Sequence, residues 1–244
     1  DVHGRDMLAR VLYGARISLT VGAVGAGVSL AIGVLWGAIA GYIGGRLDSL
    51  MMRVVDILYS LPSIVFVIVL ITALNGWLER WQAHGLSASS ARTLQLVGLV
   101  AGLGSVSWLT MARIVRGQVL SLRTQPFVEA SRALGAGHFH ILWRHILPNV
   151  GGVIIVYLAL TVPSVVLYES FLSYLGLGIQ PPAASLGSLI AEGATQINPI
   201  RTYWWLIVFP AVALATTLLA LNFLGDGLRD ALNPRSRAAL GRGV

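Results

Sequence analysis

Five long uncharged stretches restrict the fold of this 244-residue chain more than any other feature. Each lies between ionisable residues and is close to, or longer than, the roughly 20 residues that a helix needs to cross a bilayer. Backbone polar groups must be satisfied internally in lipid, so such stretches are expected to be helical. The sequence thus predicts an all-α membrane protein, with residues 1–244 forming a single transmembrane domain. The predicted spans are 17–43, 57–78, 93–112, 146–168 and 202–225.

Composition points to the same class and limits the chemistry. Hydrophobic residues make up 56% of the chain and charged residues 11%, whereas soluble domains contain about 25% charged residues. There is no cysteine and no lysine, since all 17 basic residues are arginine. A chain without lysine cannot supply the lysine of a nucleotide-binding P-loop or form a lysine Schiff base. Any energy that this protein uses must therefore come from elsewhere.

The arginines are unevenly distributed between the two sets of loops, and cytoplasmic loops of membrane proteins collect them. Their distribution predicts a cytoplasmic carboxyl terminus and a cytoplasmic segment 113–145. The arginines assigned to that side are Arg46, Arg53, Arg113, Arg116, Arg123, Arg132, Arg144, Arg229, Arg235, Arg237 and Arg242. Those assigned to the opposite loops are Arg80, Arg92 and Arg201.

Two further segments are predicted not to span. The uncharged stretch 170–191 contains a Pro-Pro pair and several glycines, so we predict an external re-entrant loop over 169–201 with short helical pieces. Residues 1–16 alternate arginines with apolar side chains, which predicts an amphipathic segment on the membrane surface. Because five spans is an odd number and Asp1 is not a natural start, a sixth helix is expected before it.

The segment 113–145 ends in a polar, glycine-broken pair of short helices, read from EASRALGAGHFHILWRHILP. Thr124 and Pro126 are a plausible cap and first-turn pair, Gly135 can end a helix in the left-handed conformation, and Pro148 is expected to limit the second helix. A polar helical loop between two spans is a surface to which a soluble partner can bind.

The same loop carries a resemblance to a known family. Glu129, Ala130, Gly135, Leu147 and Pro148 resemble the EAA signature of permease subunits in bacterial ATP-binding-cassette importers, where the loop docks on the ATPase. Other segments resemble the dipeptide and oligopeptide permease family, and above all its C-type, oligopeptide-importing subunit. These segments are HGRDMLARVLYGARISLTVG, RLDSLMMRVVDILYSLP, MARIVRGQVLSLR, SFLSYLGLGIQPP and NFLGDGLRDALNPR.

This resemblance implies a polytopic helical ABC-importer permease fold with a second permease, two ATPases and an external peptide-binding protein as partners. ATP and Mg²⁺ would then bind to the ATPases, with no cofactor in this chain and no catalysis by it. Ser131 replaces the second alanine of the general signature, and His145 stands where many importers have isoleucine. The implied ATPase-coupling residues are Glu129, Ala130, Ser131, Leu134, Gly135, His145, Leu147 and Pro148.

A glycine recurs every fourth residue near the end of the first span. Small residues at this spacing let helix backbones approach closely in lipid, where apolar side chains gain little from leaving the solvent. The stripe therefore faces protein, and two partners remain open: a helix of this chain or a second permease subunit. Its members are Gly33, Gly37, Gly41 and Gly45.

Polar residues near the spans leave further alternatives. Asp48 and Asp56 can each pair with an arginine in an interfacial contact or contribute to a gate. Glu169 ends the fourth span and is either an outer boundary charge or part of the translocation path. The three histidines in 138–145 invite a metal interpretation, but no cysteine or second carboxylate accompanies them, so no metal site is expected.

The sequence therefore predicts a permease subunit that moves peptides across the bacterial cytoplasmic membrane and is driven by partner ATPases. A permease of the same family for another solute, such as a nickel chelate, is the alternative. An ion-coupled secondary transporter is a further alternative, but the spans lack the interior charged residues that mark proton relays. A non-transporting scaffold leaves the polar helical loop unexplained.

Overall fold

The computed structural model describes residues 4–84, 87–197 and 202–232. Within these ranges the chain is helical, and five helices or helical runs are long and apolar enough to cross a membrane: α1, α3, α4, α6 to α7, and α9. Arg201, Arg235, Arg237 and Arg242 lie outside the described residues. The elements are α1 Met7–Ile43, α2 Gly45–Ser60, α3 Ser63–Ala83, α4 Ala88–Leu122, α5 Pro126–Ala133, α6 His138–Ile141, the π-helical η1 Leu142–Ile146, α7 Leu147–Tyr174, α8 Leu186–Thr195 and α9 Trp205–Leu232.

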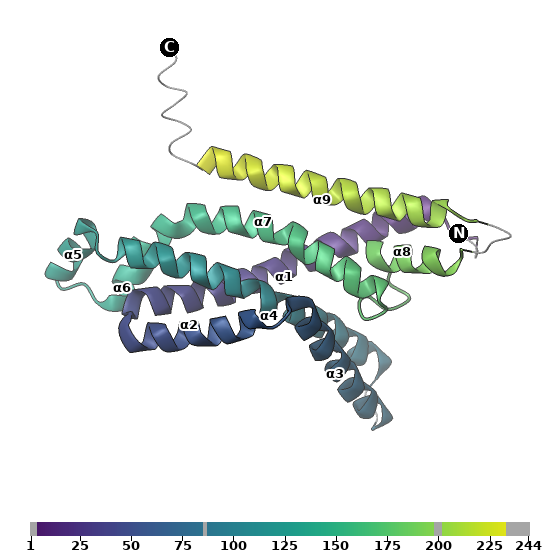
Figure 1. Cartoon of the computed structure of the whole chain (residues 1–244), viewed down its shortest axis with the longest axis horizontal. Helices are drawn as coiled ribbons and strands as arrows, with labels where there is room; N and C mark the ends of the chain where they lie inside the picture. Colours follow the sequence, from purple (N-terminus) through teal and green to yellow (C-terminus); the bar gives the residue numbers. More distant parts are fainter. Residues whose placement is uncertain (1–3, 85–86, 198–201, 233–244) are drawn as a thin grey trace, which may run out of the picture.

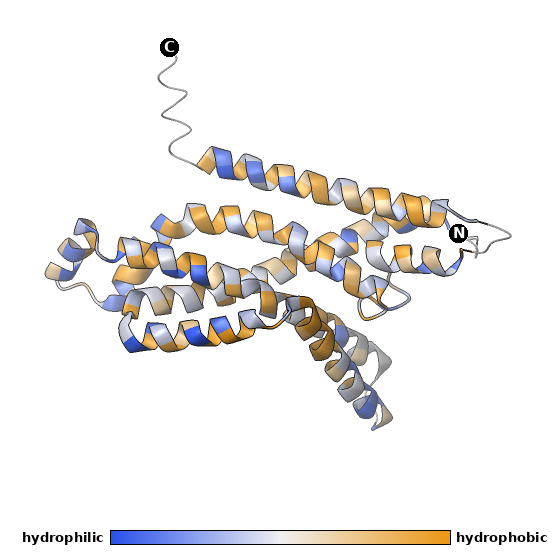
Figure 2. Ribbon diagram, viewed as in Figure 1, coloured by the Kyte–Doolittle hydropathy of each residue, from blue (hydrophilic) through white to orange (hydrophobic). Residues whose placement is uncertain are grey.

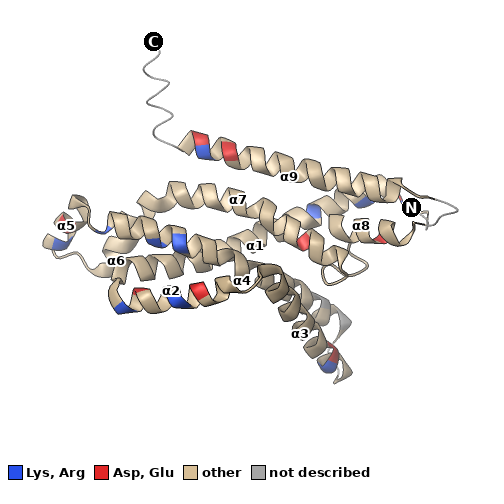
Figure 3. Cartoon of the chain, viewed as in Figure 1, with Lys and Arg blue, Asp and Glu red and all other residues tan. Residues whose placement is uncertain are grey.

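The long helices run alternately in opposite directions, which sorts the connections to two ends of the molecule (Figure 1). Helices α5 and α6 lie at one end, here called the loop end, and α8 lies at the other, here called the α8 end. Helix α1 packs along α4 and α7, α9 packs along α7 and α8, and α3 leans away from the bundle beside the first half of α4. Apolar residues dominate the long helices (Figure 2), and charged residues gather along α2, α5 and the neighbouring helix ends (Figure 3).

Several boundaries differ from those expected from charge. Residues 7–16 are not a separate surface segment but the first turns of the 37-residue helix α1. Asp6 caps this helix, because its carboxylate accepts bonds from the backbone N–H groups of Leu8 and Ala9. The second span is broken between α2 and α3 at Pro62, since proline disfavours a helical conformation in the residue before it.

Two helices extend beyond their predicted spans. Helix α4 continues from 112 to Leu122, because its arginines pair with carboxylates of α2 rather than marking the start of a loop. Helix α7 continues to Tyr174 and includes Pro163. The segment predicted as a loop over 169–201 therefore begins with the end of α7 and contains α8, which packs against α7 and α9.

Helices α1 and α4 meet along a seam of small residues. A Cβ added at Gly33 would lie 2.6 Å from Met111 Cβ, and one added at Gly41 would lie 2.8 Å from the Arg116 carbonyl oxygen. Gly37 approaches the backbone of α4 in the same way, so α4 of this chain covers the glycine stripe. Gly45 does not belong to the seam: it begins α2 with φ 61° and has open space at its Cβ position.

Candidate functional site

Local sequence determines the shape of α5 at the loop end. Pro126 occupies its first turn, where the missing N–H is harmless, and Glu129 places a carboxylate near the positive end of the helix. Gly135 ends it at φ 83°, and its N–H and that of Ala136 donate to the carbonyls of Arg132 and Ser131, at 3.0 and 3.1 Å. This pair of bonds is a Schellman motif, which requires the left-handed conformation that glycine adopts freely.

The N-terminal cap of α5 differs from expectation. The cap residue is Gln125, whose side chain makes no capping bond, while the Thr124 hydroxyl donates to the carbonyl of Ser121 at 3.3 Å. Thr124, which was expected to cap α5, therefore bonds to the last turn of α4 instead. Proline at the start of α5 supplies the local preference for helix that the missing side-chain cap does not.

The second short helix does not stop at Pro148. Helix α6 runs into the π-helical turn η1, and Pro148 lies in the first turn of α7 within one continuous helical run. A π-turn widens the helix and changes the hydrogen-bonding pattern, which accommodates a proline that has no N–H to donate.

The three histidines of the loop do not converge on one point. His138 bonds Tyr42, whereas the rings of His140 and His145 meet edge to face with centroids 5.6 Å apart. Among the described residues there is no group of three or more metal-binding side chains.

The residues assigned to ATPase coupling share one loop but differ in exposure. Glu129, Ala130, Leu134, Gly135 and Pro148 are exposed, and the other three, Ser131, His145 and Leu147, are half-buried. The structure brings them to one end of the molecule.

The loop also has apolar side chains on two sides. On its inner side, Val128, Ile141 and Ile146 are fully buried in a cluster with residues of α4 and α7. On its outer side, Phe139 and Leu134 are 75% and 89% exposed. Leu134 is one of the coupling residues expected from the sequence, whereas Phe139 was missed, although a large apolar side chain in a polar loop is a usable signal.

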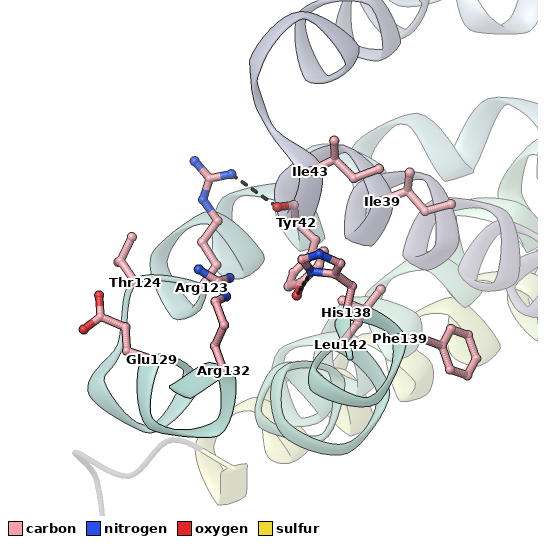
Figure 4. A pocket seen from close by; sticks show the side chains of 10 residues that line it. All are labelled: Ile39, Tyr42, Ile43, Arg123, Thr124, Glu129, Arg132, His138, Phe139 and Leu142. Carbon is pink, nitrogen blue, oxygen red and sulfur yellow. Dashed lines mark hydrogen bonds between the residues drawn. The ribbon is translucent and has the colours of Figure 1, made fainter. Parts of the chain in front are cut away.

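Two contacts missed from the sequence join this loop to α1. The Arg123 guanidinium donates through Nη1 to the carbonyls of Gly41 and Tyr42, at 3.2 and 3.3 Å, and so closes the C-terminal end of α1. The Tyr42 hydroxyl and His138 Nδ1 are 3.0 Å apart. These residues border a pocket of about 800 Å³ (Figure 4). It is lined by Ile39, Tyr42, Ile43, Arg123, Thr124, Glu129, Arg132, His138, Phe139 and Leu142.

Ion pairs fasten α2 to α4 near the same end. Arg116 donates from Nη2 to Asp48 Oδ2 at 2.7 Å and from Nε to Oδ1, which is a bidentate pair. Arg113 donates to Asp56 at 2.7 Å and lies over the Tyr59 ring. The hydrogen bond from Arg116, together with its charge, lowers the pKa of Asp48 below its ordinary value. Both aspartates thus form the interfacial pairs considered from the sequence.

The α8 end contains a buried carboxyl group instead. Glu169 is 0% exposed, so its carboxyl group is not in contact with water in this structure. Ser18 of α1 donates to Oε2 at 2.8 Å, Ser173 donates to Oε1 at 2.7 Å, and a longer bond comes from the neighbouring serine. The two shorter-bonded hydroxyls in turn accept from the backbone N–H groups of Leu186 and Ile179. Glu169 therefore connects α1, α7, the following loop and the start of α8.

A second carboxylate, on the exposed side of α8, joins this helix to α1. Glu192 accepts a bidentate pair of bonds from Arg10 of α1, at 2.8 and 2.9 Å. Glycines bring the backbones into contact: Gly178 meets Ser173, and Gly193 meets the Leu206 carbonyl. These contacts hold α8 against the neighbouring helices of the same chain.

Comparisons with known proteins agree with this architecture. Residues 33–238 match the family model described as "Binding-protein-dependent transport system inner membrane component". The oligopeptide transport system permease protein OppC of Haemophilus influenzae is 46% identical, with 97% of this chain aligned to 70% of that protein. The dipeptide transport system permease protein DppC of Bacillus subtilis is 44% identical, over 97% of this chain and 68% of that protein.

Solved structures show the same fold at low sequence identity. A chain of the inward-facing MetNI methionine ABC transporter superposes with a TM-score of 0.69 at 19% identity, covering 93% of this chain and 98% of that one. A chain from an amino acid ABC transporter with histidines gives a TM-score of 0.57 at 16% identity, covering 92% and 98%.

Proposed function

Since this chain belongs to the family of binding-protein-dependent transport system inner membrane components, we propose that it is the permease subunit of an ATP-driven peptide importer. It is an inner-membrane protein with several apolar helices. The relatives named above are permeases of oligopeptide and dipeptide transport systems, which supports peptides as the cargo over other small solutes.

The observation that carries the coupling role is the two-sided packing of the α5–α6 loop. Its outer face presents Leu134 and Phe139, whose side chains are largely exposed. Its inner face inserts Val128 and Ile141 into the core that α4 and α7 share. Protein cores are close-packed, so a displacement of α5 is transmitted to both spanning helices rather than absorbed locally.

The loop also acts on α1. Arg123 follows α4 directly and holds the last carbonyls of α1, while His138 bonds Tyr42 in the last turn of that helix. A partner that pushes on α5 and α6 thereby moves the ends of α1, α4 and α7 together. This linkage supports a role for Glu129, Ala130, Leu134 and the other assigned residues in receiving motion from an ATPase.

The remaining parts of the importer are those that the resemblance to peptide permeases implies. ATP and Mg²⁺ bind to two separate ATPase subunits in this proposal, which agrees with the lack of a P-loop lysine in this chain. A second permease completes the path, and an external binding protein delivers the peptide. The loop end and the carboxyl terminus face the cytoplasm, in keeping with the arginine distribution.

A matched pair of substitutions tests the coupling role. Leu134→Asp places a charge on the exposed face of the loop, and Leu175→Asp places the same charge on a half-exposed leucine at the α8 end. We expect Leu134→Asp to lower recovery of ATPase subunits with the purified complex about tenfold, and Leu175→Asp to leave it unchanged. Equal recovery in both variants contradicts docking through this loop.

The cargo is tested separately in vesicles that contain the assembled transporter and its binding protein. Uptake of a labelled tripeptide should depend on ATP and be blocked by unlabelled peptide. Competition by a nickel–histidine chelate, but not by peptide, would instead assign the transporter to another solute.

A further inference from the structure

The pocket at the loop end combines unused cationic donors with an apolar wall. It lies between the end of α1, the end of α4 and the α5–α6 loop, with a volume of about 800 Å³ (Figure 4). That volume is in the range of pockets that hold small organic ligands. The coupling role proposed above uses contacts of Arg123, Tyr42 and His138 within the chain and assigns no ligand to the cavity between them.

Two guanidinium groups provide its polar side. Arg132 projects from α5 into the pocket and makes no hydrogen bond or ion pair with any residue that the structure describes. Arg123 uses one terminal nitrogen, Nη1, for the carbonyls of α1, which leaves Nε and Nη2 without a partner in the described ranges. Arginine carries five N–H donors in a planar fork that matches phosphate oxygens. The imidazole of His138 lies beside them in the lining of the pocket.

One carboxylate, that of Glu129, also borders the pocket. In Figure 4 it points away from Arg132, toward Thr124 and the outside of the loop, and no ion pair joins it to either arginine in the described part of the chain. The centre of the pocket is therefore cationic.

The apolar side continues out of the pocket along α1. Ile39 and Ile43 line the pocket and are 41% and 57% exposed, and the exposed Leu35 and Ile32 continue the same face toward the middle of the helix. Residues 32, 35, 39 and 43 fall on one side of an α-helix, apart from the glycine seam that α4 covers. Because α1 is a candidate membrane span, this track runs from the helix end into the hydrocarbon region.

We propose that this pocket binds an anionic phospholipid. Its phosphodiester lies between Arg123 and Arg132, and one acyl chain lies along Ile43, Ile39 and Leu35. Basic pockets between membrane helices bind such headgroups, because guanidinium donors meet phosphate oxygens where lipid excludes water. A free phosphate or nucleotide would use the arginines but leave the apolar track uncovered. The bound lipid links α5 to the capped end of α1.

The test measures lipid binding to the intact membrane complex that contains this chain. Native mass spectrometry in detergent would count bound palmitoyl-oleoyl phosphatidylglycerol, with phosphatidylcholine of the same acyl chains for comparison. The variant is Arg132→Gln, and the matched control is Arg144→Gln, which removes an arginine from the same loop outside this pocket. We expect one tightly bound phosphatidylglycerol per copy of the chain, with affinity about fivefold lower in Arg132→Gln and unchanged in Arg144→Gln.

Each other outcome overturns the proposal. Equal phosphatidylglycerol binding in the wild type and Arg132→Gln removes the pocket as the site. Equal binding of the two phospholipids removes the charge selectivity. Displacement of the lipid by millimolar inorganic phosphate assigns the arginines to a free anion. Lipid that is bound only after the ATPase subunits are stripped from the complex, and is absent from the intact complex, assigns the pocket to the ATPase. Ile39→Asn adds an independent check, since it should weaken lipid binding while leaving both arginines in place.

Discussion

The loop end and the α8 end use the same turn chemistry in opposite surroundings. A Schellman motif closes α5 at Gly135 and another closes α7 at Gly176, with φ values of 83° and 79°. After Gly135 the chain leaves apolar side chains exposed and borders an open pocket. After Gly176 it turns back, and Gly178 and Gly187 pack against the backbone of α7 while Gly14 of α1 meets the start of α8. The turn therefore sets only the local direction of the chain.

The carboxylates differ in the same way. Glu129 is exposed at the loop end, while Glu169 is fully buried at the α8 end and bonded by serine hydroxyls. Burying an ionisable group is costly unless hydrogen bonds compensate, so Glu169 belongs to a region that stays assembled. The loop end leaves its donors and apolar groups available to other molecules. We expect substitutions at the α8 end to affect folding, and those at the loop end to affect partners.

The largest effect is expected at Gly187 in the first turn of α8. A Cβ there would lie 2.5 Å from Ser170 Cα and closer still to the carbonyl oxygen, so Gly187→Val must push α8 away from α7. We expect loss of most folded protein after detergent extraction, measured by size-exclusion chromatography. Gly117→Val is the control, since nothing lies within 4 Å of its Cβ position. Equal yields of the two variants would show that α8 is not held against α7.

Glu169→Ala should have the second-largest effect, a loss of stability. The change leaves the Ser18 and Ser173 hydroxyls without their acceptor and opens a cavity, at a cost of about 3 kcal/mol. Thermal unfolding in detergent measures this loss. Glu169→Gln keeps one acceptor oxygen and the shape of the side chain, so its loss should be smaller. A normal unfolding temperature for Glu169→Ala would contradict a structural role and return this residue to the candidates for the path.

Asp48→Asn tests the ion pair that holds α2 against α4. Loss of a bidentate charge-assisted contact should cost about 2 kcal/mol at pH 7. Arg116 lowers the pKa of Asp48, so the pair stabilises the fold fully above the ordinary aspartate pKa of about 3.9 and less as the pH falls through the lower folded-state value. The difference in unfolding temperature between the wild type and Asp48→Asn should therefore shrink below about pH 3.9. A difference that stays constant from pH 7 to pH 3 would exclude the ion pair as its source.

Gly135→Val should have the smallest effect on stability, about 1 kcal/mol, because its Cβ meets open space and only the left-handed φ is penalised. The substitution should instead lower the coupling of ATP hydrolysis to transport, because a changed turn tilts Glu129 and Ala130. The measurement is the number of peptides taken up per ATP hydrolysed in reconstituted complexes.

Gly137→Val is the matched control for that variant, because Gly137 lies in the same loop at φ −68° with open space around it. Equal coupling in the two variants would remove the Gly135 turn from the mechanism.

Much of the fold and of the loop could be predicted because it depends on local chemistry. Length and hydrophobicity identified the spans, and the glycine at 135 was placed correctly at the end of a short helix. The cap assigned to Thr124 and the stop assigned to Pro148 were wrong. Both assignments used one residue to locate a helix boundary, whereas the neighbouring turns of α4 and η1 determined how that residue was used.

Sequence alone determined that this chain crosses a membrane in helices, lacks a P-loop lysine and carries a short helical loop between two spans. Composition and residue type are sufficient for these conclusions, because transfer into lipid and turn geometry act over a few neighbouring residues. Tertiary structure alone decided that Gly41 packs on α4 while Gly45 faces open space, and that Glu169 is bonded by Ser18, 151 residues earlier. It also brought Arg123 and Arg132 to one pocket. Such contacts depend on which helix lies opposite, and spacing along one helix carries no information about its partner.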